Sequence, residues 1–387
     1  MPVARSLWRL LEAIMQIGVP LETVSGERRV AATPETVKKF VKAGHSVIVQ
    51  RGAGDPASFT DDAYTEAGAT LCSAQEAFAA ELILKVRAPQ SDELKSIGAG
   101  KVVLGMLDPF NAEHLQSMAQ AGITGFALEA APRITRAQSL DVLSSQANLA
   151  GYKSVLLATQ YYDRIFPMMM TAAGTLKATQ VVIMGAGVAG LQAIATARRL
   201  GAVVWASDVR PSAKEQVASL GGKFIDVPFE TDEERDIAEG VGGYARPMPQ
   251  AWMERQAALT AQRCAQANIV ITTALIPGRP APTLITEETV RSMAPGSVIV
   301  DLAIERGGNC PLTVAGEVIE KHGVKIVGLT NLPSMLATDA SALYARNLLD
   351  FLKLIVDENG NLAIQKDDEI VKACLVCENG QILWGKE

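Results

Sequence analysis

The sequence predicts an α/β protein with two doubly wound, parallel-sheet lobes joined by two long helices. Short apolar runs alternate with amphipathic stretches along most of the chain, a rhythm typical of parallel sheets covered by helices. Residues 181–208 carry a glycine-rich turn between an apolar run and a helical pattern, which is typical of nucleotide-binding lobes. A chain of 387 residues also exceeds what one hydrophobic core usually serves, so we expect two domains.

The composition narrows the class of protein. Hydrophobic residues make up 48% of the chain and charged residues 20%, as in an ordinary globular protein with a large core. A net charge of −6 argues against a nucleic-acid surface, and five scattered cysteines suit a reducing compartment. No apolar run approaches the roughly twenty residues that cross a bilayer. We therefore expect a cytoplasmic protein without a nucleic-acid partner.

Residues 1–14 are expected to precede the first lobe as an extension. They lack the apolar core and the cleavage site of a signal peptide. Two interpretations stay open, because the segment is either a helical extension or a stretch that precedes the native start at Met15.

The first lobe is expected to contain residues 15–143 together with 341–387. Its strands are predicted at Ile17–Val19, Val47–Gln50, Leu82–Val86, Val102–Met106 and Ile123–Leu128, and its helices at Pro34–Ala43, Ala74–Ala80, Asp92–Ile97 and Ala112–Ala119. After Asn359 the pattern favours short antiparallel strands with a turn at residues 378–380, so the end of the chain completes this lobe.

The second lobe is expected to span residues 144–340. Its strands are predicted at Val181–Met184, Val203–Ala206, Phe224–Val227, Ile269–Thr273, Val298–Leu302 and Ile326–Gly328, separated by helices at Pro211–Leu220, Gln250–Ala267 and Glu287–Ala294. Two long helical stretches, 144–163 and 341–357, are expected to join the lobes and to leave a cleft between them for a cofactor.

The glycine turn of the second lobe has the spacing of a dinucleotide-binding fingerprint. The strand ending at Met184 runs into Gly185-Ala186-Gly187-Val188-Ala189-Gly190, and a helical pattern follows to Leu200. Gly185 permits a tight turn, Gly187 lets the backbone approach a pyrophosphate, and Gly190 lets the helix pack close to the strand. The start of that helix offers unpaired N–H groups to the phosphates.

An acidic residue completes this fingerprint about twenty residues further on. Asp208 ends the next strand, where its carboxylate can accept both hydroxyl groups of a ribose. A carboxylate repels a 2′-phosphate, so NAD is favoured over NADP. Val209 and Arg210 follow directly, and the arginine weakens this preference slightly.

A long connection, Pro228–Gln250, interrupts the second lobe. Connections of this length inside a compact domain are usually functional or disordered. Tyr244 and Met248 could fold over a bound nucleotide, but a plain surface excursion explains the length equally well.

Groups for acid–base chemistry are scarce. The three histidines, His45, His114 and His322, occupy positions typical of surface or capping residues. Lys85 at a strand end is better placed, although a solvated lysine is the simpler interpretation. Direct hydride passage between two nicotinamides needs no proton transfer, only positioning and exclusion of water. The chain has one fingerprint, so the second nucleotide would be held by a partner.

The segment between the lobes supplies polar groups that suit a nicotinamide and its ribose. Arg133, Gln138, Asp141 and Ser144 offer a guanidinium, an amide, a carboxylate and a hydroxyl group. The competing interpretation is a helix start, with Ser139 or Asp141 as its cap and Arg133 as a solvated charge. Spacing alone favours that second interpretation.

Cys374 and Cys377 form a CxxC pair. On an extended strand the two sulfurs would point to opposite faces, which does not suit a metal. We expect a structural role and no metal site.

With these motifs assembled, the chain closely resembles the NAD(H)-binding component, domain I, of proton-translocating nicotinamide nucleotide transhydrogenase in its split form. The matching motifs are PRITRAQSLDVLSSQANLAGY at 132–152, FPMMMTAAGT at 166–175, GAGVAGLQAIATARRLGA at 185–202 and TTALIPGRPAP at 272–282. The resemblance implies a homodimer that binds NAD(H) and passes hydride to NADP(H) on a partner subunit. It also implies docking on a membrane subunit that conducts protons, at the cytoplasmic face of the inner membrane.

The resemblance also implies roles for individual residues. Arg133, Gln138, Asp141 and Ser144 would hold the nicotinamide ring, and Tyr244 and Met248 would belong to a loop that closes over NAD. The remaining cofactor-binding positions would be Gly185, Ala186, Gly187, Val188, Gly190, Asp208, Val209, Arg210, Thr273, Ala274 and Leu275.

Two other functions remain as alternatives. Alanine dehydrogenases are related, and Arg29 and Lys85 match positions that grip a 2-oxo acid in that family. Their catalytic histidine should follow the strand near Val102–Met106, where this chain has Gly-Met-Leu-Asp-Pro instead. A non-catalytic NAD(H) sensor, in which residues 228–250 close on the reduced form, is the third possibility.

Overall fold

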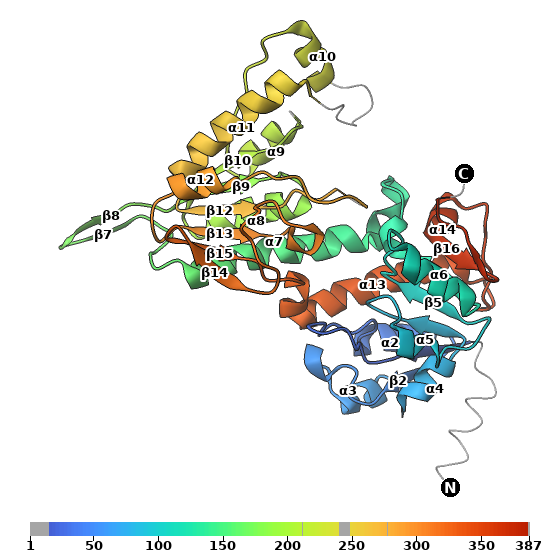
Figure 1. Ribbon diagram of the computed structural model, residues 1–387. Helices are drawn as coiled ribbons and strands as arrows, with labels where there is room; N and C mark the ends of the chain where they lie inside the picture. The colour runs from blue at the N-terminus through green and yellow to red at the C-terminus, as the bar shows by residue number, and fades with distance from the viewer. Residues whose placement is uncertain (1–14, 211, 240–247, 277, 386–387) are drawn as a thin grey trace. The chain divides into compact units, whose positions relative to one another are not determined.

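The computed structural model describes residues 15–210, 212–239, 248–276 and 278–385 (Figure 1). The expected extension at residues 1–14 and the predicted loop residue Tyr244 lie outside the described residues. The chain divides into two compact units, one reaching to Gln146 and resuming at Pro333, the other being Ala147–Leu332. The sequence places these boundaries a few residues away, after residues 143 and 340.

The first unit is built on an eight-stranded sheet in the order β17-β16-β6-β5-β4-β1-β2-β3. The strands are β1 (Gln16–Val19), β2 (Ser46–Gln50), β3 (Thr70–Cys72), β4 (Leu82–Leu84), β5 (Val102–Gly105), β6 (Thr124–Ala127), β16 (Leu375–Glu378) and β17 (Gln381–Ile382). All pairs are parallel except β6–β16 and β16–β17, so the end of the chain completes this sheet, as the sequence predicts.

Helices cover both faces of the first sheet. They are α2 (Pro34–Lys42), α3 (Asp61–Glu66), α4 (Ala74–Ala79), α5 (Ser91–Leu94), α6 (Ala112–Gln120), α13 (Ala337–Ile355) and α14 (Glu369–Cys374). The long helix α13 places Tyr344, Leu348 and Phe351 in the core, where the Phe351 and Phe126 rings lie 5.4 Å apart. Helix α13 therefore belongs entirely to this unit instead of joining the units as expected, because its buried face packs into this core.

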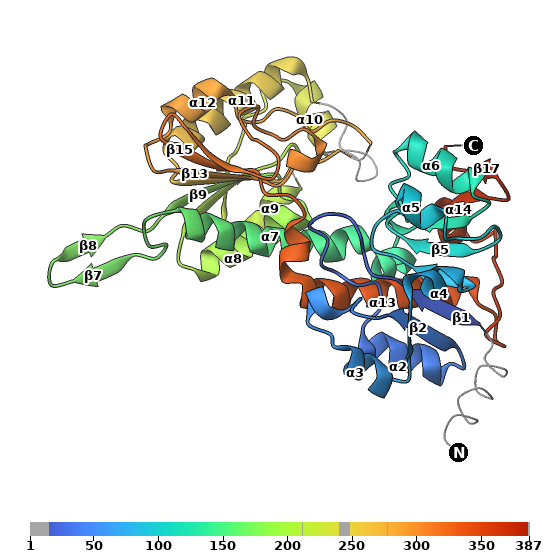
Figure 2. The same ribbon diagram turned by 60° about the horizontal axis from the view of Figure 1, so that its bottom comes forward.

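The second unit is built on a seven-stranded sheet in the order β11-β10-β9-β12-β13-β15-β14, parallel except for β14 against β15. The strands are β9 (Gln180–Met184), β10 (Val203–Ser207), β11 (Lys223–Phe224), β12 (Ile269–Thr272), β13 (Val298–Asp301), β14 (Val318–Lys321) and β15 (Val324–Val327). Helix α7 (Val142–Tyr161) leads in from the first unit, and α8 (Val188–Arg199), α9 (Ala213–Ser219), α10 (Asp232–Glu239), α11 (Gln250–Ala265) and α12 (Glu287–Ser292) flank the sheet (Figure 2).

The strand order puts a topological switch point at the centre of each sheet. In the second unit β9 lies between β10 and β12, and in the first unit β1 lies between β2 and β4. The chain winds away in opposite directions from such a central strand, which leaves a crevice at the carboxyl ends where ligands bind. The predicted fold class, two doubly wound α/β lobes, is confirmed.

A two-stranded hairpin, β7 (Met169–Thr171) and β8 (Gly174–Leu176), projects from the second unit (Figures 1 and 2). The sequence analysis assigned no strands here. Met168 is 63% exposed and Met170 is 74% exposed, and Leu176 is also largely exposed. Burial in a core cannot explain this apolar arm within one chain, so it indicates a surface for association.

Two further features correct the sequence analysis. Helix α10 lies within the connection that was expected to be a plain loop; six of its eight residues are charged, so it lacks the apolar stripe that marks a helix in sequence. Cys374 ends α14 and only Cys377 lies on a strand, so the CxxC pair does not span one extended segment. Among the described residues, no helix combines the length and apolar character that a bilayer crossing requires.

Candidate functional site

The glycine turn of the second unit is so tightly packed that larger side chains do not fit. Gly185 has φ of 99°, a left-handed conformation that favours glycine, and a Cβ there would lie 2.5 Å from Thr273 Oγ1. A Cβ at Gly190 would collide with the carbonyl oxygen of Gly185. The turn after β9 and the first turn of α8 are therefore in backbone contact, as the fingerprint predicts.

The start of α8 has the features of an anion site. Gly187 is its N-cap and supplies no side-chain acceptor to the free N–H groups of the first turn. A Cβ at Gly187 would meet no atom within 4 Å, so the space in front of the helix is open. Ala186 is buried behind this opening and Val188 is exposed beside it. This geometry fits a pyrophosphate held by backbone N–H groups.

Asp208 follows β10 and fixes the turn from the other side. Its Oδ2 accepts a hydrogen bond of 2.7 Å from Ala186 N, and Arg210 donates to both carboxylate oxygens from Nε and Nη2 at 2.9 and 3.0 Å. Burial opposes ionisation, but the hydrogen bonds from Arg210 and Ala186 outweigh it and lower the pKa of Asp208. The carboxylate is thus charged at neutral pH, while neighbouring Val209 is exposed.

A small cavity of about 120 Å³ adjoins Asp208. Its other walls are Lys214, Phe224, Asp226, Val227, Phe229 and Trp252. The Phe229 and Trp252 rings are stacked 6.5 Å apart, and Met248 is buried in the same apolar cluster. Met248 would have to leave this cluster to contact a nucleotide, and no local pattern in the sequence indicates that burial.

The loop after β12 approaches the glycine turn from the opposite side. Thr273 Oγ1 hydrogen-bonds the carbonyl oxygens of Met184 and Gly185 at 3.2 and 3.0 Å. Ala274 is held through both backbone groups: its N donates to Asn309 Oδ1 at 3.1 Å, and its O accepts from Asn309 Nδ2 at 3.0 Å. Leu275, the next residue, is exposed. Three of the sequence-predicted positions thus line one short segment beside the turn.

Asn309 and the carboxylate behind it are functional residues that the sequence analysis missed. Asp301, at the end of β13, is 1% exposed. It accepts hydrogen bonds from Thr272 Oγ1, Ala303 N, Asn309 N, Cys310 N and Thr313 Oγ1 at 2.8–3.1 Å. The signal in sequence was a buried strand that ends in an acid followed by a glycine pair, but nothing local shows which residues it binds.

The polar quartet predicted to hold a nicotinamide lies in the first unit. Arg133 and Gln138 are exposed, the latter on a short 3₁₀ helix (Thr135–Leu140), and Arg133 forms no ion pair with any residue that the structure describes. Asp141 Oδ1 accepts from Ser144 N at 2.9 Å and Oδ2 from Ser144 Oγ at 2.6 Å. The capping role left open by the sequence is therefore present for Asp141, while Arg133 and Gln138 remain available to a ligand.

Lys85 is not the solvated lysine that the sequence favoured. Its side chain is 0% exposed and its Nζ lies 2.8 Å from Glu93 Oε1 and 3.1 Å from Glu22 Oε2. Burial raises the pKa of Glu22, although Lys85 partly offsets this rise. Lys85 follows β4 directly, so the short strand turns its side chain into the core, where it needs charged partners.

Arg29 is likewise saturated by internal partners. It forms a bidentate pair with Glu27 through Nε and Nη2 at 2.7 and 2.6 Å, and its Nη1 donates to Gln146 at 2.8 Å. Burial raises the pKa of Glu27, but the paired arginine more than reverses this and brings it to about 2. A carboxylate ligand at Arg29 or Lys85 would have to displace a resident glutamate.

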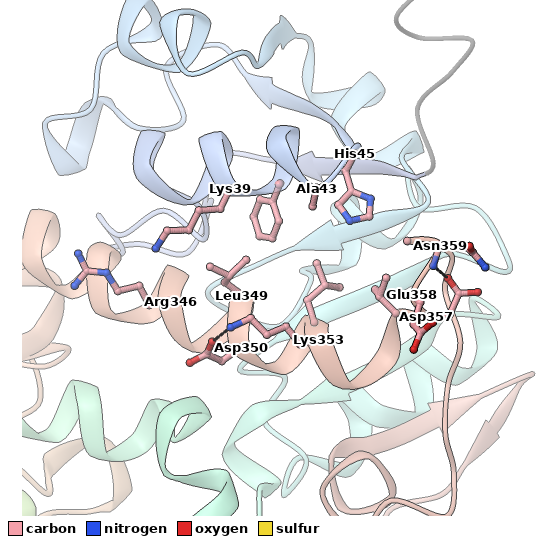
Figure 3. Close-up of a pocket in the computed structure, with 14 residues that line it drawn as sticks. Lys39, Ala43, His45, Arg346, Leu349, Asp350, Lys353, Asp357, Glu358 and Asn359 are labelled. Carbon is pink, nitrogen blue, oxygen red and sulfur yellow. Dashed lines mark hydrogen bonds and ion pairs between the residues drawn. The ribbon is translucent and has the colours of Figure 1, made fainter.

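The largest groove of the first unit lies elsewhere, between α2 and α13 (Figure 3), with a volume of about 700 Å³. Lys39, Arg346 and Lys353 line it, and His45 closes one end. The His45 Nδ1 is buried without a hydrogen-bond partner among the described residues, and burial lowers its pKa. None of the predicted site residues lines this groove, and we assign it no part in the chemistry.

The other two histidines and the cysteines lie away from the glycine turn. His322 has a left-handed φ of 53° and its Nε2 contacts Glu287 at 3.0 Å, whereas His114 lies on α6. All five cysteines are buried and unpaired. Within the described parts of the chain, no cluster of three or more histidine, cysteine or acidic side chains could hold a metal ion.

Protein-family models match nearly the whole of both units. The alanine dehydrogenase/PNT N-terminal domain matches residues 18–150, and the C-terminal domain of the same family matches residues 154–385. The first segment of the divided alpha subunit of the Rhodospirillum rubrum NAD(P) transhydrogenase is 51% identical over 378 residues, which cover 95% of this chain and 98% of that protein. The resemblance inferred from the sequence motifs is confirmed.

Two solved structures agree with this assignment. A transhydrogenase from Sinorhizobium meliloti aligns with a TM-score of 0.86 and 50% identity, covering 95% of this chain and 99% of that one. An L-alanine dehydrogenase is more distant, with a TM-score of 0.78 and 25% identity over 95% of this chain and 96% of that one.

The first prediction separates the two glycines at the start of α8. Gly187→Ala should fold with stability within about 0.5 kcal/mol of wild type, because its Cβ would enter open space. The same Cβ stands where a pyrophosphate approaches, so the dissociation constant of NADH should rise about tenfold or more. Gly190→Ala should instead destabilise the unit by about 1–3 kcal/mol, because the turn and helix must separate.

Thermal unfolding without nucleotide and a fluorescence titration with NADH measure the two effects. A Gly187→Ala variant that binds NADH as tightly as wild type would show that the opening at α8 is not the phosphate site.

The second prediction concerns Asn309. Asn309→Ala should lower stability by about 1–3 kcal/mol and also weaken NADH binding, because the bonds that position Ala274 are lost. Thr313→Val is the matched control, since it removes a hydrogen bond to the same Asp301 without touching the 273–275 segment. It should lose stability and keep the NADH affinity of wild type. Equal NADH affinities in the two variants would contradict the positioning role.

Proposed function

Because the chain belongs to the alanine dehydrogenase/PNT family, on its transhydrogenase alpha-subunit branch, we propose that it is the NAD(H)-binding subunit of a proton-translocating transhydrogenase. In this role it passes hydride from bound NADH directly to NADP(H) held by a partner subunit. The observation that carries the proposal is the second unit's switch point, where a tight glycine turn, an uncapped helix start and a charged Asp208 converge.

The residues at this switch point suit the successive parts of a dinucleotide. The open start of α8 would hold the pyrophosphate, with Gly187 allowing close approach. Asp208 would accept the ribose hydroxyl groups of the adenosine half, whose base fits the aromatic cavity beside it. Thr273, Ala274 and Leu275, at the end of β12, would then border the nicotinamide half.

The quartet on the first unit supplies the orientation that hydride transfer needs. When bound, NAD(H) supplies the hydride chemistry itself. The exposed Arg133 and Gln138 would hydrogen-bond the carboxamide and ribose of the nicotinamide, and the bonds from Asp141 to Ser144 keep that segment in place. No proton is exchanged with the substrate, so the protein contributes positioning and exclusion of water instead of an acid or base.

The proposed partners follow from this division of labour. The chain acts as a homodimer, and the exposed methionines of the β7–β8 hairpin are a suitable apolar contact for a second copy. One partner subunit carries NADP(H), and another forms the proton channel in the membrane. The protein would therefore sit peripherally on the cytoplasmic face of the inner membrane through these subunits.

An alanine-dehydrogenase-like activity is the second candidate, and it has weaker support. Arg29 and Lys85 are both engaged by buried glutamates. The turn after β5 carries no histidine; instead Glu129 accepts hydrogen bonds from Leu107 N and Asp108 N. This candidate predicts oxidation of NADH by pyruvate and ammonia without any partner present.

The third prediction tests the proposed function by reconstitution. Mixed with a cognate NADP(H)-binding subunit, the protein should reduce an NADP analogue at the expense of NADH, and alone it should show little activity. Gln138→Asn should slow this transfer by about a hundredfold while the dissociation constant of NADH changes little, because a small displacement of reacting rings is enough.

Single-turnover kinetics and NADH fluorescence report these two quantities separately. Ser139→Ala, on the same 3₁₀ helix, is the control and should transfer hydride at the wild-type rate. The proposal fails if purified wild-type components never exchange hydride, and the role of Gln138 fails if the asparagine variant is as fast as wild type.

The fourth prediction concerns the hairpin. Replacing Met168 and Met170 by serine should shift the protein from dimer towards monomer, because the variant removes exposed apolar surface that association would bury. Sedimentation or light scattering over a range of concentrations measures this shift. Met253→Ser, an exposed methionine on α11, should leave the dimer intact. A dimer that persists unchanged in the hairpin variant would exclude this contact.

A further inference from the structure

The segment that follows β12 ends in an exposed apolar pair. Leu275 is 52% exposed and Ile276 is 45% exposed, and both come directly after the residues that border the glycine turn. Neither belongs to the apolar clusters that make up the core of the second unit. Single exposed apolar residues are common on protein surfaces, but two large adjacent ones beside a ligand site indicate a surface for recognition.

The base of this segment is held firmly on both sides. Asn309 bonds Ala274 N and O on one side and donates to Pro282 O at 2.8 Å on the other. Ala281 N donates to Arg306 O at 2.8 Å. The buried Asp301 in turn fixes Asn309 through a 2.8 Å bond from its backbone N. An apolar tip on a fixed base loses little conformational freedom on binding, which favours association.

The place of this tip follows from the winding of the sheet. A dinucleotide lies across a switch point with one half on each side. Asp208 and the aromatic cavity put the adenosine half on the β10 side, so the nicotinamide half falls on the β12 side. Leu275 and Ile276 therefore stand next to the end of the cofactor that carries the hydride.

We propose that Leu275 and Ile276 form a docking point for the partner subunit that carries NADP(H). This inference rests on the proposed function, in which two nicotinamide rings meet at about 3–3.5 Å with water excluded. The partner must then cover the surface around the nicotinamide half, and an uncharged apolar pair at that border is the kind of surface that an interface core buries.

The hairpin does not compete for this role. Its exposed methionines belong to β7–β8, a separate projection of the second unit from the segment after β12 (Figure 1). We therefore assign the hairpin to the homodimer and the Leu275–Ile276 tip to the NADP(H)-carrying subunit, and the two assignments can be tested independently.

The fifth prediction uses the double variant Leu275→Ser/Ile276→Ser. Its affinity for the purified NADP(H)-binding subunit, measured by calorimetry, should fall about tenfold or more. NADH binding should stay within about twofold of wild type. Hydride exchange should be slow at low partner concentration and recover when the partner is saturating. Val314→Ser/Met253→Ser, two exposed apolar residues of the same unit, is the control and should bind the partner like wild type.

Each contrary result has a distinct meaning. Unchanged partner affinity in the tip variant overturns the docking point, even if wild-type protein exchanges hydride normally. Loss of NADH affinity in the tip variant also overturns it, because the pair would then belong to the nucleotide site. Absence of hydride exchange in wild-type mixtures refutes the proposed function instead. Thermal unfolding checks the variants, and Leu275→Ala/Ile276→Ala replaces the serine pair if that pair does not fold.

Discussion

One buried carboxylate organises the carboxyl edge of the second sheet. Asp301 lies in the core with almost no contact with water, where an unsatisfied charge would be strongly unfavourable. Five donors from β12 and from residues 303–313 satisfy it, and each of them is fixed in return. Through Asn309 the constraint reaches Ala274, and Thr273 carries it to the glycine turn. The nucleotide edge is thus rigid before any ligand arrives.

The features that the sequence revealed are those set by local rules. The strand, glycine turn, helix and acid of 181–208 follow from steric limits and spacing within a few dozen residues, and the structure places Gly185, Gly190 and Asp208 as the fingerprint requires. The alternation of apolar runs also located most strands of both sheets, because buried parallel strands are continuously apolar. Short elements such as β3 escaped, since three residues carry too little pattern.

The features that the sequence did not reveal depend on contacts between distant residues. Asn309 meets Ala274 across 35 positions, and Lys85 meets Glu22 across more than 60, so no local window contains either pair. Lys85 looked like a surface residue because lysine usually is one. Helix α10 was missed because its residues are mostly charged, and its anchoring by Arg255 to Glu230 and Glu234 is likewise non-local. Roles of the Arg133–Ser144 quartet came from motif likeness, not from spacing.

The two sheets share one winding order around their central strands, β1 and β9. Duplication of a single ancestral lobe would produce such a match. The copies have since diverged in what occupies the central crevice: one has sealed it with a glutamate–lysine–glutamate trio, and the other has left it accessible beside a bare helix start. A chain with two equivalent crevices thus keeps only one that a nucleotide can enter, and this asymmetry gives the molecule a ligand stoichiometry of one for each copy of the polypeptide.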